Sequence, residues 1–154
     1  MLEVHSPLSG TTLALANVDD PVLAQEIVGA GVAVAPVEER WHDVVAPVDG
    51  KLLKVHPHAF IVFTRSGIGI LVHLGIDTIK LRGNGFEVLK SEGDTVKRGE
   101  PIVRWDSAVA KEHGLSTSVS VIACDLPRDL LVFHSSPGNG ISRESLLYTV
   151  SSPS

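Results

Sequence analysis

The chain has 154 residues, a formal net charge of −5 and a single cysteine, Cys124. This length is enough for one domain with a substantial apolar core, and one cysteine excludes an internal disulfide framework. The 13 Lys and Arg residues are scattered singly, which argues against nucleic acid as a partner, since such proteins show a basic stripe. The first residues lack a basic region followed by an apolar stretch, so no secretory signal is expected and the expected location is cytoplasmic.

The fold class follows from short β-branched runs that are separated by 14 Gly and nine Pro residues, with no sustained helical period. We expect an all-β, antiparallel β-sandwich of the barrel-sandwich kind, with short helical turns. In chain order, strands are predicted over residues 10–16, 32–35, 43–46, 51–55, 59–63, 69–74, 86–89, 101–105, 119–124 and 146–150. One short helix is predicted over residues 107–113, ended by Gly114. Residues 1–150 are expected to form a single domain, followed by a frayed tail over residues 151–154.

Two turns repeat a pattern, because Ser6-Pro-Leu-Ser-Gly10 and Ala46-Pro-Val-Asp-Gly50 each lead into an apolar run. This repetition predicts related hairpins within one compact sandwich. A third segment, Glu92-Gly-Asp-Thr-Val-Lys-Arg-Gly99, is a tight-turn pattern typical of barrel-sandwich folds.

Two histidines flank the hairpin predicted around the turn at residues 64–67. If the turn closes an even-membered loop, His58 faces His73, and Phe60 faces Leu71. Directly opposed residues have Cβ atoms roughly 4.5 to 5.5 Å apart, and Phe60 and Leu71 then line an apolar patch around two imidazoles. Each histidine alone is more often structural, so the pairing is what favours a chemical site. It depends on the register, because a one-residue slip moves a side chain to the opposite face.

Past His73 the chain continues Leu-Gly-Ile-Asp77-Thr78 into a glycine-rich loop. An Asp-Thr pair at this distance can fix the tautomer of the histidine or bond a nearby backbone group. Asp77 can equally be the residue that forms an Asx turn.

Five segments together resemble a known family: Ala46-Pro-Val-Asp-Gly50, His58-Ala-Phe60, His73-Leu-Gly-Ile-Asp-Thr78, Leu81-x-Gly-x-Gly-Phe86 and Gly93-Asp-x-Val-x-x-Gly99. They are similar to the enzyme IIA (EIIA) domain, glucose family, of the bacterial phosphoenolpyruvate-dependent sugar phosphotransferase system. The resemblance covers nearly the whole chain, and the order and spacing of the motifs make it specific.

The resemblance implies a β-sandwich phosphocarrier, that is, a phosphotransferase component with a phosphohistidine intermediate. The family's second histidine, here His73, accepts a phosphoryl group from phosphohistidine on the carrier HPr and passes it to a cysteine of an enzyme IIB domain. That domain belongs to a membrane IIBC permease, which couples sugar uptake to phosphorylation. The family's first histidine, here His58, stabilises the phosphoryl group. Regulatory proteins are further partners of some relatives, and no cofactor or metal is required.

Supporting residues are expected around this pair. His56, Asp77 and Thr78 are candidates for assisting the two histidines, and Phe60 and Leu71 for contacting partners. The chain also departs from the family pattern. His56 stands where better-known members carry threonine, and other positions differ as well: Leu23 and Leu71 replace aromatic residues, and Ala30 an acidic one.

Three other functions are compatible with parts of the sequence. His56-Pro-His58 and His73-Leu-Gly-Ile-Asp77 match the zinc-binding motifs of LytM-type hydrolases, although in reversed order along the chain. His58 and His73 alone could hold an adventitious or regulatory zinc ion. A lipoyl or biotinyl carrier shares the glycine-rich turns, but neither Lys54 nor Lys80 has the flanking residues it needs. A regulatory protein that binds partners without transferring phosphate is the remaining alternative.

Overall fold

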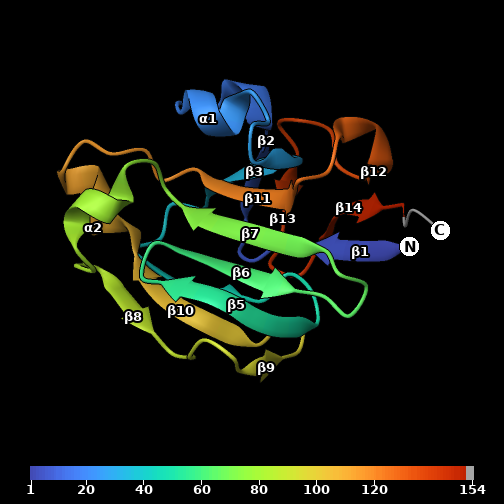
Figure 1. The fold of residues 1–154 in the computed structure, drawn as a ribbon. Helices are drawn as coiled ribbons and strands as arrows, with labels where there is room; N and C mark the ends of the chain where they lie inside the picture. Colours follow the sequence, from blue (N-terminus) through green and yellow to red (C-terminus); the bar gives the residue numbers. More distant parts are fainter. Residues whose placement is uncertain (152–154) are drawn as a thin grey trace.

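The computed structural model describes residues 1–151, and antiparallel strands are the main regular structure in them (Figure 1). The strands are β1 (Leu2–His5), β2 (Gly10–Ala14), β3 (Gly29–Pro36), β4 (Trp41–Val45), β5 (Gly50–His56), β6 (Ala59–Phe63), β7 (Gly69–Leu74), β8 (Phe86–Val88), β9 (Thr95–Val96), β10 (Pro101–Asp106), β11 (Val119–Cys124), β12 (Leu131–Phe133), β13 (Gly140–Ile141) and β14 (Leu146–Val150). The helices are α1 (Pro21–Ala24) and α2 (Ser107–Glu112), with 3-10 turns η1 (Leu15–Asn17), η2 (Thr78–Leu81) and η3 (Arg128–Leu130). The predicted antiparallel sandwich with short helical turns is confirmed.

The strands form one large sheet and two small ones. The eight-stranded sheet has the order β13-β2-β3-β11-β7-β6-β5-β9, and the three-stranded sheets have the orders β1-β14-β12 and β4-β10-β8. If the order of the large sheet is read inward from its two ends, β13 takes the place equivalent to β9, β2 to β5, β3 to β6, and β11 to β7. The small sheets correspond in the same way. The molecule therefore consists of two similar halves, and β7 and β11 meet at its centre.

The two repeated turns noticed in the sequence begin equivalent parts of these halves, and they bind each other. The backbone N–H of His5 donates to the carbonyl of Pro47, and that of Val45 donates to the carbonyl of Pro7, both at 3.0 Å. Antiparallel exchange of this kind satisfies buried backbone groups without a regular strand. The prediction of related hairpins is thus consistent with the observed pairing.

Alternating residues of β7 separate the core from the outer face of the large sheet. Ile70, Val72 and Leu74 are fully buried, whereas Leu71 and His73 are half-buried on the opposite face. The main core lies between the large sheet and the small ones and contains Trp105, Tyr148 and many branched aliphatic residues. A smaller apolar cluster covers part of the outer face and is formed by Leu15, Val18, Leu23, Ala33, Ile76 and Ile122. It fixes η1 and α1 against the large sheet (Figure 1).

The expected register of the β6–β7 hairpin is wrong by one residue. Ala59, not His58, pairs with His73, and Ile61, not Phe60, pairs with Leu71. The cause is the connection over residues 64–68, which is odd in number. Its ends are joined because the N–H of Ile68 donates to Thr64 Oγ1 at 3.1 Å and that of Thr64 to the carbonyl of Ile68 at 2.8 Å.

This slip moves Phe60 out of the patch around the histidines. Its side chain is 0 % exposed and belongs to the main core, so it cannot contact a partner. Ile61 takes its place on the outer face beside Leu71. Burying a phenylalanine side chain contributes about 1.5–3 kcal/mol to folding, so Phe60 is a stability residue.

Four short strands and helix α1 were not predicted. Strands β1, β9, β12 and β13 have two to four residues, too few for an alternating pattern to stand out. Helix α1 did have a local signal, because Asp20 caps it by accepting from the N–H groups of Val22 and Leu23. In the predicted frayed tail, the N–H of Ser151 donates to the carbonyl of Leu130 at 2.8 Å, and residues 152–154 lie outside the described part of the chain.

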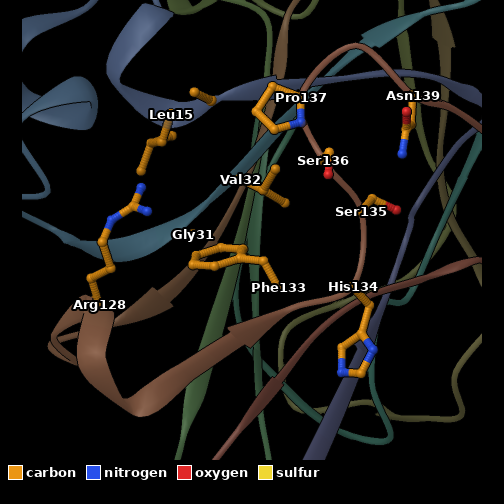
Figure 2. Close-up of a pocket in the computed structure, with 11 residues that line it drawn as sticks. Leu15, Gly31, Val32, Arg128, Phe133, His134, Ser135, Ser136, Pro137 and Asn139 are labelled. Carbon is orange, nitrogen blue, oxygen red and sulfur yellow. The ribbon is translucent and has the colours of Figure 1, made fainter.

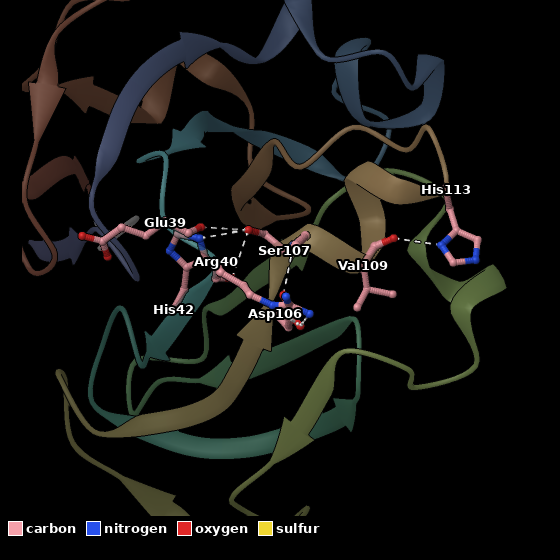
Figure 3. A network of polar contacts seen from close by, with 8 residues as sticks. Glu39, Arg40, His42, Asp106, Ser107, Val109 and His113 are labelled. Carbon is pink, nitrogen blue, oxygen red and sulfur yellow. Dashed lines mark hydrogen bonds and ion pairs between the residues drawn. The ribbon is translucent and has the colours of Figure 1, made fainter.

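A buried polar network joins the β3–β4 connection to the start of α2 (Figure 3). His42 Nε2 lies 3.1 Å from Ser107 Oγ, which in turn donates to the carbonyls of Glu39 and Arg40 at 3.2 and 3.3 Å. The guanidinium of Arg40 is 2.9 Å from the carboxylate of Asp106. Burial lowers the pKa of His42 from its ordinary value, because the charged ring would lose its hydration.

Acidification should therefore destabilise the fold through His42. The unfolded chain protonates near pH 6.5 and the folded chain only at lower pH, so the stability contributed by neutral His42 is complete above about pH 6.5 and decreases as the pH falls below it. The pKa of His58 is lowered as well and acts in the same direction. Urea unfolding between pH 7.5 and 5 should give a shallower dependence of unfolding free energy on pH for His42→Gln than for the wild type. Substituting the exposed His113 by Gln is the matched control, and equal slopes for wild type and His42→Gln would contradict the assignment.

Candidate functional site

His73 lies at the end of β7, between Ala59 of β6 and Ser120 of β11. Its Nδ1 is 2.7 Å from the carbonyl oxygen of Gly75. A carbonyl only accepts, so Nδ1 carries the hydrogen of the neutral ring, and Nε2 is left with a free lone pair. The backbone of the following turn thus sets the tautomer that a nucleophilic Nε2 requires.

Gly75 can place its carbonyl there because it has no side chain. Its φ of +78° lies in the left-handed region, and a Cβ atom would approach Thr78 Cγ2 to 2.6 Å and the carbonyl of Ser116 to 2.8 Å. The N–H of Gly75 also donates to the carbonyl of Ser118 at 3.0 Å, which holds the turn against the segment before β11. The orienting group of His73 is therefore rigid.

The two polar residues predicted to assist His73 do not bond its ring. Thr78 is buried, and its Oγ1 donates to the carbonyl of Leu74 at 2.6 Å, so it bonds the backbone beside the histidine. Asp77 has a φ of +60°, and its exposed carboxylate lies 3.9 Å from Lys80 Nζ. The tautomer of His73 thus depends on Gly75, which in the sequence only follows the predicted strand over residues 69–74.

His58 reaches His73 from the two-residue turn between β5 and β6. Its carbonyl accepts from the N–H of Leu74 at 2.7 Å, which ties the turn to β7. The ring centroids of His58 and His73 are 5.4 Å apart, with an edge-to-face angle of 76°. Burial lowers the pKa of His58, and the neighbouring His73 and His56 lower it further, which favours the neutral ring.

His56 extends this pair into a row of three imidazoles. It is exposed, and its ring stacks on that of His58 with centroids 5.8 Å apart and an angle of 26°. Its aromatic contact is with His58, and it makes no hydrogen bond to His73 within residues 1–151.

The histidines lie at the border of an apolar surface. Leu71 and Ile61 flank them on the sheet, and Leu71 packs against the smaller cluster below α1. Two large apolar side chains next to that cluster in the sequence are exposed: Val22 on α1 at 49 % and Ile79 on η2 at 64 %. We call Val22 and Ile79 the apolar rim. Exposed apolar groups gathered near polar ones are typical of a surface that docks another protein.

Ser120 was missed in the sequence. It is fully buried directly opposite His73, and its Oγ has no hydrogen-bond partner in residues 1–151. Only the pairing of β7 with β11 brings it there, and nothing in the local sequence announces that pairing.

Metal binding finds no support in this arrangement. No three His, Cys, Asp or Glu side chains within residues 1–151 are grouped as ligands of a metal ion. Nδ1 of His73 is bonded to a carbonyl, and the carboxylate of Asp77 lies beside Lys80. The zinc-hydrolase alternative therefore has no structural basis here.

A separate hollow of about 370 Å³ lies between β2, β3 and the segment from Arg128 to Asn139 (Figure 2). Arg128 is its permanent cation. Its Nε bonds Glu26 at 2.9 Å, and its guanidinium lies over the ring of Phe133 at 5.0 Å. Because the charge of Arg128 is already paired with Glu26, the hollow is a weaker candidate for a functional site than the row of histidines.

The antiparallel sandwich and its pair of neighbouring histidines are the arrangement expected of the enzyme IIA (EIIA) class of proteins. The chain belongs to the family described as phosphoenolpyruvate-dependent sugar phosphotransferase system, EIIA 1, whose model matches residues 2–127. No helix within residues 1–151 has the length and apolar character required to cross a bilayer.

Individual relatives agree with this family. The glucose-specific EIIA component of Staphylococcus epidermidis is 39 % identical over 107 residues, which cover 68 % of this chain and 63 % of that protein. The glucose-specific EIIA component of Haemophilus influenzae is 35 % identical over 127 residues, or 81 % of this chain and 75 % of that protein. The solved structure of glucose permease IIA from Mycoplasma capricolum superposes with a TM-score of 0.80 at 31 % identity, covering 96 % of this chain and 94 % of the other. The chain spans less than two thirds of the length of the Staphylococcus epidermidis relative.

Substitution of Gly75 tests the orienting bond. Alanine at any position with φ near +80° costs about 1–2 kcal/mol, but at Gly75 the added Cβ also clashes with Thr78 and displaces the carbonyl from His73. Gly93→Ala is the matched control, because Gly93 has a φ of +91° and open space around it. We expect a greater loss of unfolding free energy for Gly75→Ala. Nitrogen NMR of the His73 ring should show a mixture of tautomers in Gly75→Ala and one tautomer in Gly93→Ala; a single Nδ1–H tautomer in both would rule out the role of this carbonyl.

Proposed function

We propose that this protein is a phosphocarrier that receives a phosphoryl group from phospho-HPr on His73 and delivers it to a cysteine of an enzyme IIB domain. Delivery supports sugar uptake and phosphorylation by the associated permease. The observation that carries the proposal is the bond from His73 Nδ1 to the Gly75 carbonyl, which leaves Nε2 as a free nucleophile. Membership of the EIIA family and the names of the relatives support the same activity.

The transfer needs little more than alignment of the attacking nitrogen, the phosphorus atom and the nitrogen that leaves. The Nε2 lone pair attacks phosphorus while the P–N bond of the donor breaks and its electron pair returns to the donor imidazole. In the second step, a cysteine thiolate attacks the same phosphorus, and the Nε2–P bond returns its electrons to His73. While His73 carries the phosphoryl group and keeps hydrogen on Nδ1, its ring is cationic, and the Gly75 carbonyl stabilises that charge.

His58 has the role of phosphoryl stabiliser in this proposal. The centroids of the His58 and His73 rings are 5.4 Å apart and their planes meet at 76°. We expect an N–H of His58 to donate from there to a phosphoryl oxygen bound at Nε2 of His73. Such a charge-assisted hydrogen bond contributes on the order of 1.5–3 kcal/mol. Thr78 supports the site through the carbonyl of Leu74, and Asp77 is an exposed charge at its edge.

The apolar rim and Leu71 form the proposed docking surface for HPr and IIB. Some relatives carry IIA together with permease parts, because the glucosamine-specific EIICBA component of Bacillus subtilis is 39 % identical over 118 residues that cover 18 % of that protein. We therefore infer that the partner IIB belongs to a membrane IIBC permease, and that this cytoplasmic protein meets it transiently. Apolar contacts suit a partner that must exclude water and then leave.

The covalent step is tested by incubation with phosphoenolpyruvate, enzyme I and HPr. We expect an acid-labile mass increase of about 80 Da, one phosphoryl group, that is absent in His73→Gln. His58→Gln should still form the adduct but transfer it to IIB at least tenfold more slowly, since it loses a bond worth about 1.5 kcal/mol or more. His113→Gln is the control, because His113 is exposed at the end of α2. An adduct that persists in His73→Gln would refute the proposed function.

The docking surface is tested separately by a charge at the apolar rim. Ile79→Asp should raise the concentration of HPr needed for half-maximal phosphorylation by about tenfold, because a buried interface position then carries an unpaired carboxylate. Val132→Asp is the matched control, since Val132 is 52 % exposed on β12. Equal effects of the two substitutions would remove the rim from the interface.

A further inference from the structure

The ring of His58 lacks a hydrogen bond to any protein group in residues 1–151, although the backbone around it is fixed. Its neighbour Pro57 restricts φ, and the pairing of His56 with Ala59 closes a tight turn around the two residues. The carbonyl of His58 is bound by Leu74. The side chain itself can still rotate about χ1 and χ2.

Two neighbouring rings, those of His73 and His56, limit the rotation of the His58 side chain. His73 meets the His58 ring edge-to-face at 5.4 Å and 76°, whereas His56 lies nearly parallel to it at 5.8 Å and 26°. His73 is held by Gly75, and His56 is the last residue of β5, so both neighbours come from anchored strands. An imidazole without a hydrogen-bond partner thus takes its orientation from packing.

We propose that His56 is a positioning residue, whose stacked ring holds the His58 imidazole edge-on to His73 so that His58 meets the phosphoryl group in one orientation. This rests on the proposed phosphoryl transfer and adds to it a residue that acts only through His58. The contact requires a flat ring at position 56 and does not require its nitrogens. The stack distinguishes this role from a direct hydrogen bond to His73, which His56 does not make within residues 1–151.

The size of the effect follows from the conformations that the stack excludes. A side chain released into three staggered χ1 wells spends about a third of its time in the productive one, and free χ2 rotation reduces this further. Losing the stack should therefore slow transfer from phospho-His73 to IIB about three- to sixfold. Docking should be unaffected, because His56 is not part of the apolar rim.

The experiment is a single-turnover measurement of phosphoryl transfer to IIB by His56→Ala and His56→Phe, each in the wild-type and His58→Gln backgrounds. We expect His56→Ala to lower the maximal transfer rate about three- to sixfold with an unchanged half-saturating IIB concentration, and His56→Phe to restore the wild-type rate. In His58→Gln, His56→Ala should have no further effect, because the two residues act as one unit. His113→Ala controls for the loss of an exposed imidazole.

A spectroscopic readout completes the test without using activity. NMR contacts between the His58 and His73 rings should be retained in His56→Phe and averaged in His56→Ala. The proposal is overturned if His56→Phe is as slow as His56→Ala, if His56→Ala transfers at the wild-type rate, or if its effect persists in His58→Gln. Failure of the proposed function looks different, because then the wild type itself would carry no phosphoryl group on His73.

Discussion

The bond between His73 Nδ1 and the Gly75 carbonyl is the constraint on which the site depends. It exists because β7 is followed by a left-handed glycine, Gly75, whose N–H donates to the carbonyl of Ser118, and because Thr78 packs so closely that no Cβ fits. A side chain that bonded the ring could rotate away. The Gly75 carbonyl cannot, because the Ser118 bond and the packing of Thr78 hold the backbone that carries it. The nucleophilic nitrogen is thus presented by backbone geometry, and its tautomer persists as long as the end of β7 is folded.

The internal repeat explains why the site is open on one side only. The β2–β3 connection of the first half contains η1 and α1, whose apolar residues cover the outer face of β3 and β11. The equivalent β5–β6 connection of the second half is the turn of Pro57 and His58. This short turn leaves the neighbouring outer face uncovered and places an imidazole at its edge. His73 therefore lies where a covered half of the sheet meets an exposed half, with apolar groups on one side and solvent on the other.

Sequence patterns predicted the larger strands, the α2 helix and the proximity of His58 to His73, but not the reason for that proximity. Strict alternation along the predicted strand over residues 69–74 agrees with the burial of Ile70, Val72 and Leu74, because it needs only the strand itself. The register between β6 and β7 depended on the loop at Thr64, whose side-chain bond produces an odd connection. Phe60 was misplaced for that reason. Gly75 and Ser120 were beyond reach, because their roles arise from contacts between segments distant in the sequence.

Electrostatics and packing then divide the work between the two inner histidines. His73 is oriented by a hydrogen bond and keeps its reactive nitrogen free, whereas His58 is oriented by rings and is kept neutral by burial and by its neighbours. In the proposed transfer, a neutral His58 offers the incoming phosphoryl group one N–H donor. Once the phosphoryl group is attached, its oxygens can accept the N–H of His58, so the attraction arises only after the group has arrived. Because a neutral His58 adds no permanent charge to the surface, it does not trap the partner that must leave.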